Sequence, residues 1–176
     1  MKKQKKILAI IGSTRENSSN LRIVKAIAEL SRGIFLINIY DKIAQLPHFN
    51  PDLDSNVPPK KISDFRSQIE QADGIIICTP EYVFSLPGSL KNALEWTVST
   101  IAFTHKPTAL ITASASGEKA HEDLKLIMRT LGATFNQQTQ VLIQGVKGKL
   151  EGDNITDEET VLKLKQLIAS LNELII

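Results

Sequence analysis

Short apolar runs alternate along the chain with segments whose apolar residues recur every three or four positions. The continuous runs fall at residues 7–11, 34–40, 75–78, 109–112 and 139–143. Runs of this kind predict strands that are buried on both faces of a sheet. Helical spacing follows each run, at residues 21–28, 62–69, 87–96, 124–131 and 156–171. Gly33 and Gly132 are expected to end two of these helices, and Thr156 with Glu159 predicts a capping box for the last one.

This alternation predicts an α/β fold. Strands that alternate with helices form a parallel sheet with helices on both faces. Five strands fit the flavodoxin-like order 2-1-3-4-5, a three-layer sandwich, better than a six-stranded dinucleotide fold. Residues 41–59 are rich in Pro, Asn and Asp and are expected to form a loop. The whole chain, residues 1–176, is predicted to be one domain.

Composition excludes several classes of protein. Of the 176 residues, 42% are hydrophobic and 23% charged, which is typical of a globular protein, and a net charge of +2 does not favour nucleic-acid binding. One cysteine, Cys78, and three scattered histidines give no disulfide and no spacing for a metal site. The apolar run at 7–11 is too short for a signal peptide, and no run approaches a membrane span. A cytoplasmic protein without membrane or nucleic-acid partners is expected.

Ligands of such sheets bind at the carboxyl ends of the strands, so the segments after the first, third and fourth strands matter most. Residues 12–20 combine hydroxyl side chains, two asparagines and Arg15 at the start of a helix. Free N–H groups at a helix start, and an arginine that can donate two hydrogen bonds at once, favour the binding of a phosphate. Alternatively, Ser18 or Ser19 serves only as a helix N-cap. Neither a P-loop nor G-x-G-x-x-G is present.

Residues 79–88 and 113–117 are the other two candidate segments. Two prolines and a glycine stiffen the first, whose peptide groups suit a planar ring, while the second is small and polar. Tyr82 either packs on a ligand or closes the core. Glu81 is either a catalytic acid or a structural anchor. Cys78 is expected to be an inert core thiol. His105 and His121 are expected on the surface.

Three motifs carry a resemblance to a known family. The loop G-S-T-R-E-N-S-S-N resembles the pattern G-S-x-R-x-x-S-x-N of NAD(P)H-dependent FMN reductases. The run P-E-Y-V-F-S-L-P-G-S-L-K-N-A-L-E-W is similar to that family's P-E-Y-N-x-S-x-P-G-x-L-K-N-A-I-D-W. L-P-H-F-N-P-D-L at 46–53 resembles the family's L-P-x-F-N-x-D-L, and the motifs lie in the family's order and spacing.

The resemblance implies a flavodoxin-like FMN protein that passes hydride from NADPH or NADH through the flavin to an acceptor such as a quinone. No side chain need act as a nucleophile, because the cofactor carries the chemistry. The resemblance places the FMN phosphate on the first segment, the ring along the other two, and a homodimer interface on the helix at 87–96. The candidate FMN-binding residues are Ser13, Arg15, Ser18, Ser19, Asn20, Pro80, Glu81, Tyr82, Val83, Ser114, Ser116 and Gly117.

Two departures from the family pattern stand out. Val83 takes the place of the family's usual asparagine, and after Gly117 the chain reads E-K-A-H-E where the family has a glycine pair and an arginine. The alternatives are a flavodoxin-like electron carrier that does not oxidise NAD(P)H and a degenerate member without flavin. The sequence selects neither the acceptor nor the preferred nucleotide, and it leaves dimer and tetramer open.

Overall fold

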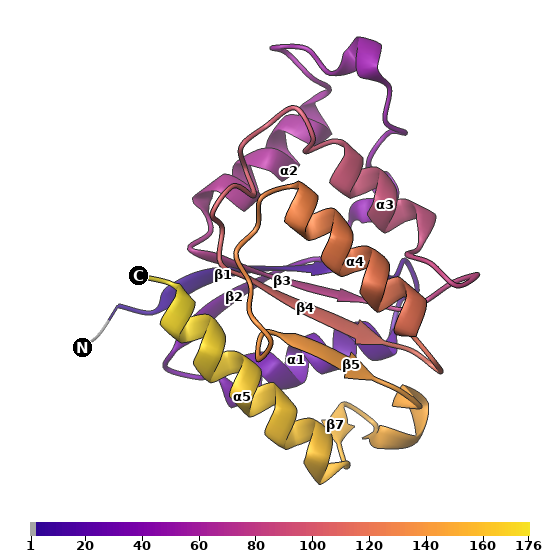
Figure 1. Cartoon of the computed structure of the whole chain (residues 1–176), viewed down its shortest axis with the longest axis vertical. Helices are drawn as coiled ribbons and strands as arrows, with labels where there is room; N and C mark the ends of the chain where they lie inside the picture. The colour runs from indigo at the N-terminus through magenta and orange to yellow at the C-terminus, as the bar shows by residue number, and fades with distance from the viewer. Residues whose placement is uncertain (1–2) are drawn as a thin grey trace.

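A parallel sheet of five strands, in the order β2-β1-β3-β4-β5, forms the centre of the protein in the computed structural model, which describes residues 3–176 (Figure 1). Each pair of neighbouring strands is parallel. The predicted strand order is therefore confirmed. The strands are β1 (Lys5–Ile11), β2 (Phe35–Tyr40), β3 (Gly74–Thr79), β4 (Thr108–Ala113) and β5 (Gln140–Ile143).

Helices cover both faces of this sheet, as the sequence predicts (Figure 1). One face carries α1 (Ser19–Leu30) and α5 (Glu158–Leu174). The other carries α2 (Lys60–Gln71), α3 (Gly88–Glu95) and α4 (Glu118–Thr130). Among residues 3–176, no helix has the length and apolar composition needed to cross a membrane.

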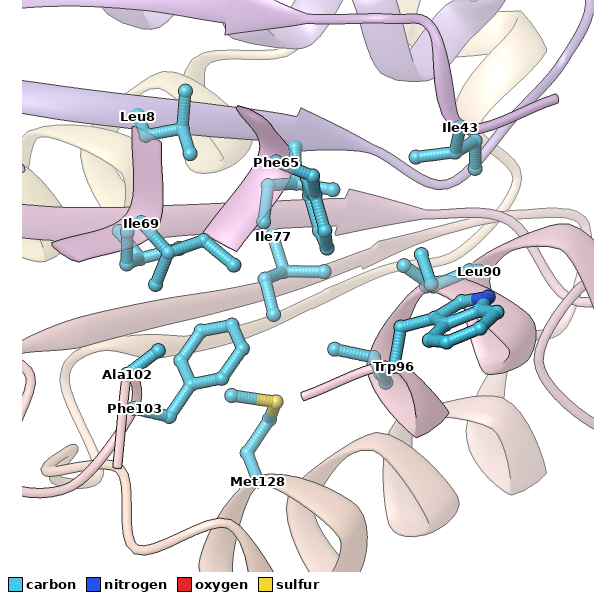
Figure 2. Close-up of a cluster of buried hydrophobic side chains, with 14 of the residues drawn as sticks. Leu8, Ile43, Phe65, Ile69, Ile77, Leu90, Trp96, Ala102, Phe103 and Met128 are labelled. Carbon is cyan, nitrogen blue, oxygen red and sulfur yellow. The ribbon is translucent and has the colours of Figure 1, made fainter. Parts of the chain in front are cut away.

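The apolar runs are continuous because each strand contributes side chains to two hydrophobic cores, one on each face of the sheet. Along β1, Leu8 and Ile10 face the α2–α4 side, whereas Ile7, Ala9 and Ile11 face α1 and α5. Figure 2 shows the α2–α4 cluster, in which two helical aromatic residues, Phe65 and Trp96, pack with strand residues such as Leu8 and Ile77. Burial of each such side chain is worth about 1.5–3 kcal/mol.

The predicted capping box of the last helix is wrong by one residue. Asp157, not Thr156, is the N-cap of α5, and its carboxylate accepts hydrogen bonds from the N–H and the hydroxyl of Thr160. A carboxylate also interacts favourably with the positive end of the helix dipole, and Lys149 lies 3.4 Å from it. Just before α5, a short hairpin of β6 (Leu150–Glu151) and β7 (Asn154–Ile155) forms that the sequence did not predict.

Two helix ends also differ from the prediction by a residue or two. α1 ends at Leu30 with Ser31 as its C-cap, and Gly33 follows in the left-handed conformation that closes the turn. α3 begins at Gly88, so Pro87 is its N-cap and not its first residue. Gly132, also left-handed, follows the C-cap of α4 as predicted.

The loop at 41–59 is fastened to the helices rather than free. It contains two short 3-10 turns, η1 (Ile43–Gln45) and η2 (Pro51–Leu53). The Pro47 carbonyl accepts hydrogen bonds from Asn92 Nδ2 and Trp96 Nε1, at 3.0 and 2.8 Å. A nearly buried ion pair, Arg66 to Asp54 at 2.7 Å, holds the later part of the loop against α2. The bonds of the Pro47 carbonyl join two of the sequence motifs, L-P-H-F-N and K-N-A-L-E-W.

The connection after β3 contains a strained two-residue turn. Tyr82 and Ser85 pair through both of their N–H groups, at 3.0 and 3.1 Å, and enclose Val83 and Phe84. Both enclosed residues have positive φ, 52° and 57°. This turn geometry favours Asn and Gly, and a β-branched residue with positive φ is an outlier that costs of the order of 1–3 kcal/mol.

Replacing Val83 by asparagine should therefore stabilise the protein. We expect V83N to raise the free energy of unfolding by about 1 kcal/mol, because asparagine tolerates the left-handed conformation. Urea unfolding measures this change. V98N is the matched control, because Val98 is also an exposed valine but has no positive φ. If V83N is no more stable than V98N, the turn is not strained.

His121 lies in the core and not on the surface, contrary to the expectation from the sequence. It is 8% exposed on α4, and its Nδ1 lies 3.0 Å from the Thr112 hydroxyl on β4. Burial lowers the pKa of His121 to about 4, with a further contribution from Lys125 and a smaller opposing one from Glu122. The ring is thus held neutral inside the protein.

This pKa predicts a loss of stability in mild acid. The unfolded chain protonates His121 near pH 6.5, whereas the folded protein resists protonation down to about pH 4. The free energy of unfolding should therefore be highest above pH 6.5 and fall by about 2–3 kcal/mol towards pH 4 through this residue. We expect H121N to lose less stability than wild type between pH 7 and pH 5 in urea unfolding. H48N, at an exposed histidine, should follow wild type, and a wild-type slope in H121N would contradict the prediction.

Candidate functional site

A cavity of about 350 Å³ opens at the carboxyl ends of the strands. The strand arrowheads in Figure 1 mark this edge of the sheet. The cavity, called the loop cavity below, is formed by the segments that follow β1, β3, β4 and β5. Its lining consists of Ser13, Arg15, Ser18, Ser19, Asn20, Pro80, Tyr82, Ala113, Ser114, Ala115, Gly145, Val146 and Lys147. Eight of the twelve predicted residues are among these.

The segment after β1 brings the start of α1 to the cavity. Ser18 is the N-cap of α1, and its hydroxyl accepts a hydrogen bond from the Leu21 N–H at 3.1 Å. Ser18 also lines the cavity, so capping and ligand binding are compatible at this residue. The Ser13 hydroxyl accepts from the Arg15 N–H and shapes the loop. Because the first N–H groups of a helix have no partner within it and carry partial positive charge, this end of the cavity suits an anion.

Asn20 joins three elements at the floor of the cavity. Its Oδ1 accepts a hydrogen bond from the Cys78 thiol on β3 at 3.3 Å, and its Nδ2 donates to the Ala113 carbonyl on β4 at 3.4 Å. Only 3% of Asn20 is exposed. Burial raises the pKa of the Cys78 thiol, which keeps it protonated and fits the predicted inert role. The Asn20 side chain therefore fixes the position of the α1 start.

Glu81 holds the loops together and does not line the cavity. Its carboxylate accepts hydrogen bonds from the N–H groups of Gly117 and Ala120, at 3.1 and 3.0 Å, and so caps the first turn of α4. Its own N–H donates to the Ser114 hydroxyl at 3.3 Å. Between the two alternatives for Glu81, these bonds favour the structural anchor over the catalytic acid. Gly117, with φ of 94°, belongs to the same cap.

Val83, Ser116 and Gly117 are likewise absent from the lining. Val83 is 95% exposed at the tip of the turn described above. Its backbone conformation is one that asparagine adopts readily, so the asparagine of the family pattern suits the turn itself. The departure at Val83 thus adds strain to the turn.

The segment after β5 completes the cavity and was missed by the sequence analysis. Gly145 has φ of 61° and turns the chain into η3 (Val146–Lys149). The N–H groups of Gly145 and Val146 donate to the carbonyls of Ala115 and Ser114, at 3.0 and 3.2 Å. The available signal was the sequence Q-G-V-K at 144–147, a glycine and a lysine just after the end of a predicted strand.

The lining fits FMN in size and in chemistry. A volume of about 350 Å³ lies in the usual range for small-molecule sites. Arg15, Lys147 and the α1 start put positive charge at one end, and none of the described lining residues is acidic. Pro80, Tyr82 and the small residues after β4 offer a neutral slot for a flat ring. Within residues 3–176, no cluster of His, Cys, Asp and Glu could hold a metal ion.

Comparisons with known proteins identify the family. The family model for NADPH-dependent FMN reductase matches residues 5–148. A 2-hydroxy-1,4-benzoquinone reductase of Burkholderia sp is 33% identical over 162 residues, which cover 88% of this chain and 87% of that protein. The quinone reductase of Escherichia coli K12 is 25% identical over 183 residues, with 99% and 97% coverage.

Solved structures give the same result. The flavoenzyme FerB of Paracoccus denitrificans, an NAD(P)H:(acceptor) oxidoreductase, superimposes with a TM-score of 0.78 at 25% identity and covers 97% of each chain. The flavodoxin-like fold and the family resemblance are therefore confirmed. The chain belongs to the NADPH-dependent FMN reductase family and is an oxidoreductase that uses FMN with NAD(P)H as the electron donor.

Proposed function

We propose that this protein oxidises NADPH or NADH and reduces a small quinone-like acceptor by way of FMN in the loop cavity. One observation carries the proposal: a cationic end at α1 and a neutral slot between the connections that follow β3 and β4 share one lining. Relatives that align over most of the chain are named quinone reductases, which supports a quinone as the acceptor.

At the cationic end, the chain binds the FMN phosphate. Arg15 donates charge-assisted hydrogen bonds, and the first N–H groups of α1, at Ser19 and Asn20, complete the cradle. The hydroxyls of Ser13 and Ser18 line the same end. The Asn20 side chain is hydrogen-bonded to Cys78 and Ala113, so its role is to hold the Asn20 backbone N–H in position.

At the neutral end, the chain orients the ring. Pro80 and Tyr82 form one side of the slot, and Ser114 approaches from the next strand. Glu81 lies between Pro80 and Tyr82 in the chain and donates its N–H to the Ser114 hydroxyl, so it holds the two sides of the slot together. Its carboxylate also accepts the Gly117 N–H at the start of α4. When bound, FMN supplies the redox chemistry by taking a hydride from the nicotinamide and giving it to the acceptor. No protein nucleophile is required.

The assembly is proposed to be a homodimer or homotetramer that uses the α3 region. Large apolar side chains are exposed just before α3, at Val83 and Phe84, and just after it, at Val98 and Ile101. Exposed apolar groups of this kind favour contact with a second chain.

Residues 1–176 are proposed to act as a single FMN-binding domain in the cytoplasm.

The direct test is visible absorbance under anaerobic conditions. Protein reconstituted with FMN and gel-filtered should stay yellow, bleach promptly with stoichiometric NADPH or NADH, and regain colour when benzoquinone is added. Retained colour that does not bleach would favour the electron carrier. No retained colour would contradict FMN binding and favour the degenerate member. The comparison of NADPH with NADH also gives the nucleotide preference.

Arg15→Ala should weaken FMN binding. Loss of a charge-assisted phosphate contact costs about 1.5–3 kcal/mol, which corresponds to an increase of roughly ten- to a hundredfold in Kd. Quenching of flavin fluorescence measures the Kd. The matched control is R32A, because Arg32 follows the far end of α1 and, among residues 3–176, forms an ion pair with Glu29 alone, on the surface. An R15A protein that binds FMN as tightly as R32A would remove Arg15 from the site.

A further inference from the structure

Lys147 lies where the loop cavity meets a second hollow. This side hollow, of about 270 Å³, is lined by Arg15, Asn17, Ser19, Arg22, Lys147 and Leu150. Three of its residues, Arg15, Ser19 and Lys147, also line the loop cavity. Lys147 therefore borders the same space as the start of α1, although it comes from the opposite end of the chain.

The backbone that carries Lys147 is held firmly. Gly145 and Val146 donate their N–H groups to the segment after β4, and the Val146 side chain, 5% exposed, packs into the α1–α5 core. Lys147 is the next residue, in the first turn of η3. Its place opposite α1 thus follows from hydrogen bonds and core packing.

No acidic side chain of the described residues pairs with Lys147. Lys149, two residues further on, pairs with Asp157 at 3.4 Å. Over residues 3–176, by contrast, Lys147 takes part in no ion pair. No acidic side chain of the described residues lines either the loop cavity or the side hollow. The three N–H groups of the ammonium are therefore available to an anionic ligand.

We propose that Lys147 is the second cation of the FMN phosphate site, opposite Arg15. The inference rests on the proposed function and deepens it. A phosphate monoester carries a charge of about −1.5 to −2 at pH 7. Arg15 supplies one positive charge and a helix start about half of another. Lys147 brings the site close to neutrality and closes the phosphate end from the β5 side.

If Lys147 binds the phosphate, its effect should differ between FMN and riboflavin. Riboflavin has the ring and the ribityl chain of FMN but no phosphate. The contribution of Lys147 should therefore appear in FMN binding and vanish in riboflavin binding. Because it is electrostatic and partly exposed to solvent, it should also weaken as salt concentration rises.

The test compares the Kd of FMN and of riboflavin, by quenching of flavin fluorescence, for wild type and a charge series at position 147. We expect K147R to bind FMN like wild type, K147Q to bind it about tenfold more weakly, and K147E to bind it more weakly still. Riboflavin should bind all four proteins alike. The Kd of FMN should depend less on salt in K147Q than in wild type.

K149Q is the matched control, since it removes the same charge from the same segment at a residue that lines neither space. It should bind FMN like wild type. If K147Q matches K149Q, or if K147Q loses FMN and riboflavin equally, the assignment of Lys147 is overturned while the proposed function stands. If wild type itself does not bind FMN, both are overturned. Thermal unfolding of each variant confirms that it is folded.

Discussion

The loops at the carboxyl edge of the sheet are bonded directly to one another, and the cavity depends on this. Strand pairing alone fixes where β1, β3, β4 and β5 end, but it leaves the connections after them free. Asn20 ties the first connection to β3 and β4, and Glu81 ties the third strand's connection to the first turn of α4. Gly145 and Val146 then tie the β5 connection to the β4 connection. Apart from the bond between the exposed Gly145 and Ala115, these bonds use buried or half-buried polar groups. Breaking one of them leaves a partner unsatisfied, so the loops hold their shape before any ligand arrives.

The residues that make the family motifs recognisable therefore fall into two kinds. Ser13, Arg15 and Tyr82 line the cavity, where the ligand is proposed to bind. The side chains of the second kind form hydrogen bonds within the protein: Asn20, Glu81, Asn92 and Trp96. The sequence predicted Asn20 and Glu81 as ligand contacts together with Arg15 and Tyr82, because a polar loop residue looks the same in sequence whether it binds a ligand or another loop.

Periodicity predicted most of the fold because burial on both faces of a parallel sheet leaves a strong apolar signal in each strand. The errors concern polar groups whose role is set by distant partners. Asp157 outcompetes Thr156 as N-cap because it also meets Lys149, and His121 is buried because Thr112 on another strand offers it a hydrogen bond. Lys147 was missed for the same reason: nothing within its own segment shows that it lies beside Arg15, 132 positions earlier in the chain.

Charge is distributed unevenly along the loop cavity, and this bears on how a flavin would orient. The cations come from the segments after β1 and β5, which adjoin the start of α1, whereas the slot between the β3 and β4 connections contains Pro80, Tyr82 and small neutral residues. A ligand with an anionic end and a flat neutral end meets a favourable partner at each end in one orientation only. In the reverse orientation, the anion would lose its cations and the uncharged ring would lie against Arg15 and Lys147 instead. Tyr82 lines the neutral slot and also begins the turn at Val83 and Phe84, so this strained and exposed tip follows directly along the chain from a residue of the ring end. The strain of the turn is therefore connected through Tyr82 to the ring end of the site.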